Sequence, residues 1–191
     1  MVSAEQILLR LRDVKEVFVD QAMAAALPTA DPVAGRMITK NLLERQRPEG
    51  LLAVVLQFHR LSSDAQDLVS DSVSKLDRSM REAAKRMETR APANVIRIIA
   101  RARAIELVYI LVDLLRHGSD PIRRESALCL LELAKLTVTS PQDTSPWDPR
   151  SVSGLREELE DLVRRDFYGR DPKILRALLA LAPRPIFTTV L

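Results

Sequence analysis

Apolar residues recur at helical spacing along most of this sequence. In the segment 104–118 (AIELVYILVDLLRHG), five apolar side chains fall three or four positions apart, as on one face of an amphipathic helix: Ile105, Val108, Leu111, Val112 and Leu115. The next segment, 119–134 (SDPIRRESALCLLELA), continues in the same way with Ile122, Ser126, Cys129, Leu130 and Leu133. Both segments are therefore predicted to be helices.

The junction between these two helices is predicted to be a tight turn. Gly118 is expected to close the first helix in the left-handed conformation that glycine adopts easily. Ser119 or Asp120 is expected to cap the second helix, and Pro121 suits its first turn, where the missing N–H costs nothing. The two helices therefore form a predicted αα-hairpin.

Similar helix-start signals recur along the chain, at Asp31-Pro32, Asp64, Ala91-Pro92, Asp120-Pro121 and Asp171-Pro172. Counted at residues 31, 64, 92, 120 and 171, they are separated by 33, 28, 28 and 51 positions. The last gap contains a segment with loop composition at 137–154, and removing its 18 residues leaves a spacing of 33. Spacings of 28 to 33 residues are typical of repeats built from pairs of helices.

The segment that begins at Asp120 resembles the second helix of a HEAT repeat. Its matching residues are Asp120, Pro121, Ile122 and Arg123, followed by Ser126, Ala127 and Leu130. Two other segments echo the pattern, Ile96-Arg97 with Ala100 and Asp171-Pro172 with Ile174 and Leu178. A resemblance to HEAT-like repeats, including the PBS-lyase type, implies an armadillo-type fold: an all-α, right-handed α-solenoid of about four to five helical hairpins.

We expect one helical repeat domain over 1–182, with an inserted loop at 137–154 and an extended tail at 183–191. An alternative interpretation concerns 94–117, which contains no Gly or Pro and is compatible with one continuous helix. The fold is all-helical in either case.

The composition agrees with a helical, soluble domain. Hydrophobic residues make up 47% of the chain and aromatic residues 4%, so Leu and Ala supply most of the core. The single cysteine, Cys129, cannot form an internal disulfide. The sequence contains no uninterrupted apolar run long enough for a membrane span, which leads us to expect a cytoplasmic protein.

Candidates for catalysis are weak. The two histidines, His59 and His117, are far apart in sequence, and each is expected to lie near the C-terminal end of a helix. We find no glycine-rich phosphate loop and no serine in a nucleophile elbow. We therefore expect no enzymatic activity, no metal site and no cofactor.

The strongest candidate surface is basic. Between residues 78 and 103, eight positive and two negative side chains give a local net charge of +6, against +3 for the whole chain. Five of the positive residues follow helical spacing and are candidate partner-binding residues: Arg78, Arg81, Lys85, Arg97 and Arg101. A solvated helix face is the alternative interpretation.

Trp147 lies in the predicted loop, framed by prolines, where it either anchors a partner or folds back onto the array.

The HEAT resemblance implies a non-catalytic scaffold that binds a protein partner. A second hypothesis is a nucleic-acid-binding protein, because a family of bacterial DNA glycosylases resembles this fold and holds DNA on a basic face. The two hypotheses differ in whether the basic side chains of 78–103 converge on one face.

Overall fold

The computed structural model describes residues 6–7, 10–11, 14, 16–139, 149–165 and 171–181. These residues form ten α-helices and four short 3₁₀ helices, with no strand among them, so the all-α prediction is confirmed. The helices of the first part are α2 (Val17–Ala26), α3 (Pro32–Arg45), α4 (Pro48–Gln57), α5 (Ser63–Asp71), α6 (Asp77–Ala84) and α7 (Arg90–Ala102). Those of the second part are α8 (Val108–His117), α9 (Asp120–Thr139), α10 (Pro149–Arg165) and α11 (Pro172–Leu181), and the 3₁₀ helices are η1 (Leu27–Thr29), η2 (Phe58–Arg60), η3 (Val73–Lys75) and η4 (Ile105–Leu107).

Each predicted helix-start signal lies at or within two residues of the start of an odd-numbered helix from α3 to α11. The Asp31 carboxylate caps α3, where it accepts hydrogen bonds from the backbone N–H groups of Val33 (2.9 Å) and Ala34 (3.0 Å). Asp171 does the same for α11, accepting from Lys173 N–H at 2.8 Å. The cap of α5 is Ser62 rather than Asp64, because the Ser62 hydroxyl accepts from Ala65 N–H at 3.4 Å.

Helix ends differ from the expectation for glycine. Gly118 does not have a positive φ, so the predicted left-handed cap at this position is wrong. Two other residues, Gln46 (φ 53°) and Arg103 (φ 52°), take the left-handed conformation and end α3 and α7. The turn at Arg103 also decides between the two interpretations of 94–117, since α7 ends there and α8 begins at Val108.

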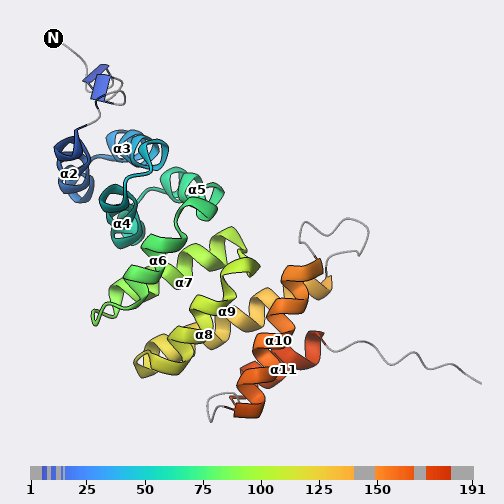
Figure 1. Cartoon of the computed structure of the whole chain (residues 1–191). Coiled ribbons are helices and arrows are strands. Elements are labelled where there is room, and N and C mark those ends of the chain that lie inside the picture. The colour runs from blue at the N-terminus through green and yellow to red at the C-terminus, as the bar shows by residue number, and fades with distance from the viewer. Residues whose placement is uncertain are drawn as a thin grey trace, which may run out of the picture. The chain divides into compact units, whose positions relative to one another are not determined.

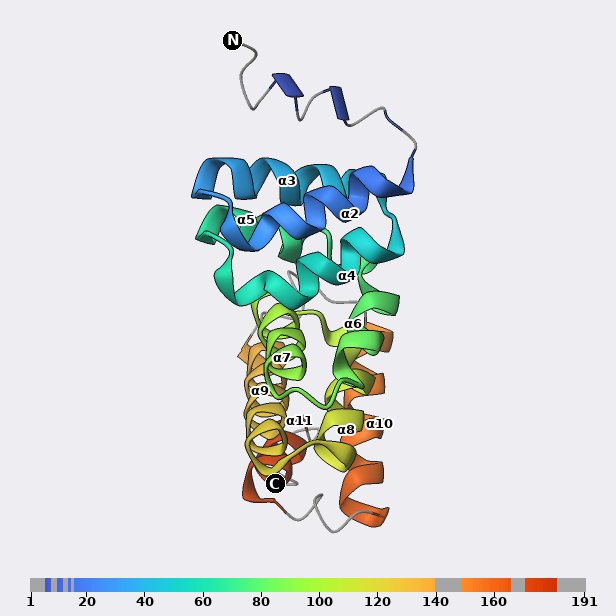
Figure 2. The same cartoon turned by 90° about the vertical axis from the view of Figure 1, so that its left-hand side faces the viewer.

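The chain groups into two compact units, Met1–Ile110 and Leu111–Leu191. In unit 1, helices α2, α4 and α6 pack against one another in sequence, and α3, α5 and α7 form a second series in the same way. The two series lie side by side in Figures 1 and 2. Between them, α3 contacts α2 and α4, and α7 contacts α4 and α6. Unit 1 is therefore a two-layer arrangement of helices.

The two layers enclose a core of aliphatic side chains. Fully buried residues of unit 1 come from both layers: Leu42, Val54, Val55, Ala65, Val69, Met80, Ala83, Val95, Ile98 and Ile99. On α7 the buried residues cover most of the circumference and leave a narrow exposed strip that includes Arg97 and Arg101. Because α7 is packed on most sides, its exposed surface consists largely of a few polar side chains.

A buried ion pair joins α2 to α3. The Arg45 guanidinium binds the Asp20 carboxylate at 2.6 and 2.8 Å, and the Asp20 side chain is completely buried. Arg45 also donates to the carbonyls of Leu11 (3.1 Å), Val14 and Glu16 (3.3 Å). The hydrogen bond that Arg45 donates to Asp20 raises the pKa of Arg45, so this guanidinium stays charged. One side chain thus holds the segment that leads into α2.

In unit 2, α11 packs against both α9 and α10. Its core contains Leu130 and Leu133 from α9, Leu155, Leu159 and Leu162 from α10, and Ile174 and Ala177 from α11. Helix α9 continues to Thr139 and α10 begins at Pro149, so both helices extend into the segment predicted as a loop at 137–154. Residues 140–148 and the predicted tail at 183–191 lie outside the described residues.

No helix in the described part of the chain combines the length and the apolar content needed to cross a membrane.

Candidate binding surface

Three of the predicted partner-binding residues lie together on α6. Ser79, Met80 and Ala83 face the core, which leaves Arg78, Arg81, Glu82 and Lys85 on the opposite side of this short helix. These four exposed side chains line an open hollow of about 330 Å³. The charge of Arg81 is partly compensated, because its guanidinium forms an ion pair with Asp77 at 2.9 Å.

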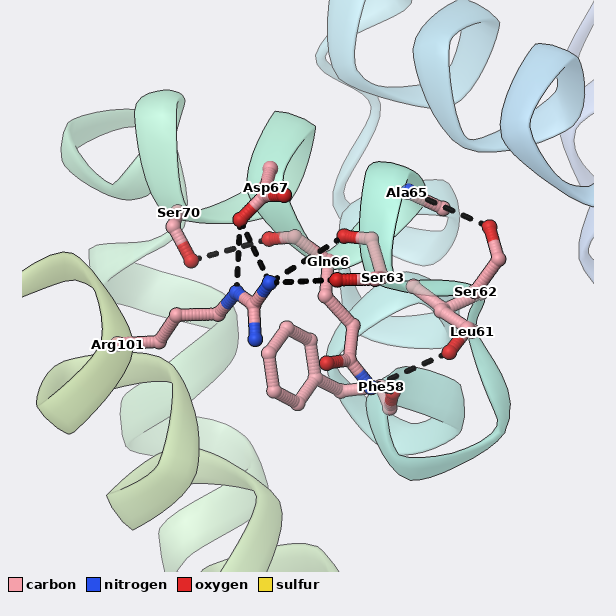
Figure 3. A network of polar contacts seen from close by, with 9 residues as sticks. All are labelled: Phe58, Leu61, Ser62, Ser63, Ala65, Gln66, Asp67, Ser70 and Arg101. Carbon is pink, nitrogen blue, oxygen red and sulfur yellow. Dashed lines mark hydrogen bonds and ion pairs between the residues drawn. The ribbon is translucent and has the colours of Figure 1, made fainter.

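The remaining predicted arginines lie on α7, in the other layer. Arg101 does not point into solvent as a free charge: it binds the Asp67 carboxylate of α5 at 2.7 and 2.9 Å and the Ser63 hydroxyl at 3.0 Å (Figure 3). Arg97, one helical turn earlier, is exposed and forms no ion pair with the described residues.

A hydrogen-bond network fixes the part of α5 that Arg101 binds. The Gln66 amide donates to the carbonyls of Phe58 (3.0 Å) and Leu61 (3.2 Å), and Ser70 donates to Gln66 O at 3.0 Å (Figure 3). These bonds connect the first turns of α5 to η2. We infer that Arg101 acts mainly as a link between α5 and α7.

The predicted residues do not gather at one place. Arg78, Arg81 and Lys85 belong to the layer of α2, α4 and α6, whereas Arg97 and Arg101 belong to the layer of α3, α5 and α7. Trp147 lies outside the described residues.

A second hollow, of about 180 Å³, lies where the end of α4 meets the start of α7. Its lining consists of Leu56, Gln57, His59, Arg60, Arg86, Glu88, Arg90 and Ala91, and we call it the His59 hollow. Arg86 and Glu88 belong to the connection between α6 and α7, which also contains the fully exposed Met87. Three arginines and one glutamate give the lining a net charge of +2 when His59 is neutral.

Asn94 holds the His59 ring in position. The Asn94 amide nitrogen is buried in α7 and lies 3.1 Å from Val55 O, 2.8 Å from Leu56 O and 3.1 Å from His59 Nδ1. The Asn94 amide has two N–H groups, and the carbonyls of Val55 and Leu56 can accept both of them. The contact with Nδ1 places the His59 ring, and the neutral ring carries one N–H donor on either nitrogen.

The surroundings of His59 disfavour its protonation. Burial lowers the pKa of His59 below its ordinary value of 6.5, and the positive charges of Arg90, Arg60 and Arg97 lower it further. The hydrogen bond with Asn94 opposes this shift but is the smallest contribution, so the net direction is downward. Arg97 is thus the predicted residue that contributes to the electrostatics of this hollow.

The arginines of the His59 hollow are not held in ion pairs by the described residues. Arg60, Arg86 and Arg90 are exposed and form no ion pair within the described ranges. The sequence prediction included Arg86 and Arg90 in its charge count but missed the hollow, because the His59-Arg60 dipeptide is 26 positions before Arg86. The contact between α4 and α7 brings these segments together.

The chemistry available elsewhere is limited. Cys129 is buried in α9, and its burial raises the pKa of the thiol to about 12. Among the described residues, no group of three or more His, Cys, Asp or Glu side chains is arranged to hold a metal ion.

Comparisons with known proteins leave the family open: no protein-family model matches the chain, and no curated protein or solved structure matches it either.

Proposed function

We propose that this chain is a non-catalytic binding scaffold, a right-handed α-solenoid of HEAT-like hairpins whose surface binds a partner protein. The observation that carries the proposal is the packing of unit 1, in which each helix from α2 to α5 contacts the helix two places further along the chain. Helical-repeat proteins bury the apolar faces of successive pairs in this way and leave continuous side surfaces for binding. The resemblance of 120–130 to a HEAT helix supports the same proposal.

The distribution of basic residues favours a protein partner over nucleic acid. A phosphate backbone is bound through many positive side chains along one path. Here the basic residues are divided between two layers, and Arg81 and Arg101 are already paired with Asp77 and Asp67. Local positive patches of this size suit an acidic segment of a protein.

The test is affinity capture from a lysate of the source organism, with and without nuclease. We expect a defined protein to be retained in constant ratio under both conditions. The double variant Arg78→Glu/Arg97→Glu removes one charge from each layer and should weaken retention. Arg36→Glu/Arg124→Glu, which makes the same change in net charge at exposed positions of α3 and α9, should not.

Direct binding to duplex DNA and to single-stranded RNA completes the test. We expect dissociation constants no tighter than about 10⁻⁴ M at physiological salt, the weak end of non-specific binding. Loss of every captured protein after nuclease treatment, together with tight nucleic-acid binding, would refute the proposal in favour of the nucleic-acid hypothesis.

A further inference from the structure

We propose that the His59 hollow binds a phosphomonoester dianion carried on a phosphorylated serine or threonine of the partner protein. The protein carrier rests on the function proposed above. The phosphoryl specificity is argued from the hollow itself.

The charge of the hollow matches that of a phosphomonoester. Its three arginines and Glu88 give a net charge of +2, and a phosphorylated side chain carries about −1.5 to −2 at neutral pH. Arg60, Arg86 and Arg90 have no carboxylate partner among the described residues, so a ligand does not have to displace an internal ion pair.

The donors of the hollow also match the oxygens of a phosphoryl group. Each guanidinium presents a planar fork of N–H groups that binds two oxygens at once. His59 lines the same hollow and, in its neutral form, adds one N–H donor. The N-terminus of α7 begins at Arg90, and its positive end adds to the attraction for an anion.

Other anions fit this hollow less well. A carboxylate has one negative charge and two oxygens, which one arginine fork satisfies and which leaves two guanidinium groups unused. A phosphodiester of nucleic acid also carries one charge per phosphate. The hollow therefore favours the dianion with three terminal oxygens.

The experiment is an NMR titration of the full chain with short Gly/Ser peptides that differ at one central residue. The probes are the phosphoserine, serine and aspartate forms, and inorganic phosphate is a fourth ligand. We expect the phosphoserine peptide to produce saturable shifts of the His59 ring and of the Glu88 and Arg90 amides. The serine peptide should produce none, and the aspartate peptide should bind at least about tenfold more weakly.

Variants assign the binding to the hollow. Arg60→Gln/Arg90→Gln should weaken phosphopeptide binding by about tenfold or more, because each removes a charge-assisted hydrogen bond. Arg36→Gln/Arg124→Gln, at exposed positions of α3 and α9 that do not line the hollow, is the matched control and should bind as the unchanged protein does. Dispersed amide spectra of each variant show that it is folded.

Three results would overturn the inference: no saturable shift with the phosphoserine peptide, equal binding of the aspartate peptide, or unchanged binding by Arg60→Gln/Arg90→Gln. Inorganic phosphate that binds more tightly than the phosphopeptide would also overturn it, because the carrier would then contribute nothing. Failure here with continued capture of a protein partner contradicts the phosphoryl site alone, whereas loss of capture contradicts the scaffold.

Discussion

At the scale of single residues, burial decides which reactive groups are available. His59 and Cys129 are the two side chains in the described part whose pKa shifts bear on reactivity, and both shifts disfavour the charged form. His59 is half-buried beside arginines, and Cys129 is buried in α9. A neutral donor and an inert thiol are therefore expected.

We expect the His59 ring to titrate below 6.5, its ordinary pKa, in an NMR pH titration. Replacement of Arg90 by Gln removes a nearby positive charge and should raise this pKa, whereas Arg78→Gln should leave it unchanged. The groups that face the ring are Arg60, Arg86, Glu88, Arg90 and Arg97.

The lowered pKa of His59 also makes the free energy of unfolding depend on pH in a definite direction. The unfolded chain binds a proton more readily than the folded chain, so the free energy of unfolding decreases as the pH falls through 6.5. The free energy of unfolding stops decreasing once the pH is below the pKa of His59 in the folded protein. His59→Gln should reduce this pH dependence in urea titrations between neutral and mildly acidic pH, and an unchanged profile would contradict the assignment.

Cys129 should be unreactive in the folded protein. A thiol with a pKa of about 12 has almost no thiolate at neutral or mildly alkaline pH, and the thiolate is the nucleophile. We expect a disulfide reagent such as DTNB to label Cys129 only after urea is added. Labelling at the same rate with and without urea would show that the side chain is accessible.

At the scale of helices, the starts were predictable from the sequence and several ends were not. A capping side chain followed by proline, as at Asp31 and Asp171, is a local signal that survives folding. Gln46 and Arg103 end their helices in a conformation that no local residue preference indicates. The His59 hollow depends on contacts between distant helices, which the repeat pattern alone does not place.

The Asp20–Arg45 pair should dominate the attachment of α2 to α3. Asp20→Ala leaves a buried guanidinium without its partner and should lower the free energy of unfolding by about 3–5 kcal/mol. Lys40→Ala breaks the exposed Lys40–Glu44 pair and should change it by less than about 1 kcal/mol. Chemical denaturation measures both, and equal small effects would mean that the buried pair is not formed.

Gly118 should not tolerate a side chain. A Cβ atom there would lie 2.4 Å from Leu114 O and 2.8 Å from Ile122 Cγ2, so the turn between α8 and α9 must shift. Gly118→Ala should destabilise the protein by about 1–3 kcal/mol. Gly154→Ala, in α10 with no atom within 4 Å, should instead stabilise it by about 0.5–1 kcal/mol. The order of the two melting temperatures tests the turn.

At the scale of the whole molecule, the apolar period and the Leu- and Ala-rich composition were enough to predict an all-α chain. The division into two compact units falls inside α8, whose residues continue the same apolar pattern on both sides, so this pattern does not mark the boundary. The handedness of the proposed solenoid and the identity of its partner also depend on how the helices are arranged in space. The spacing of residues along a sequence does not specify that arrangement.

A repeat architecture makes a prediction about unit 1. Leu42→Ala removes a completely buried side chain of α3 and should cost about 2–5 kcal/mol. In a solenoid the loss is local, so hydrogen exchange should increase most in α2 to α5 and least in α7. Exchange that increases equally over the whole unit would indicate a single cooperative core and would contradict the solenoid.

The exposed Met87 gives this protein a built-in footprinting reporter. Its thioether is open to solvent in the same connection that contributes Arg86 and Glu88 to the His59 hollow. Peroxide oxidises accessible methionines to sulfoxides, which mass spectrometry detects without any label. A partner that occupies the hollow will cover this connection, so slower oxidation of Met87 would identify the occupied state in an unmodified sample.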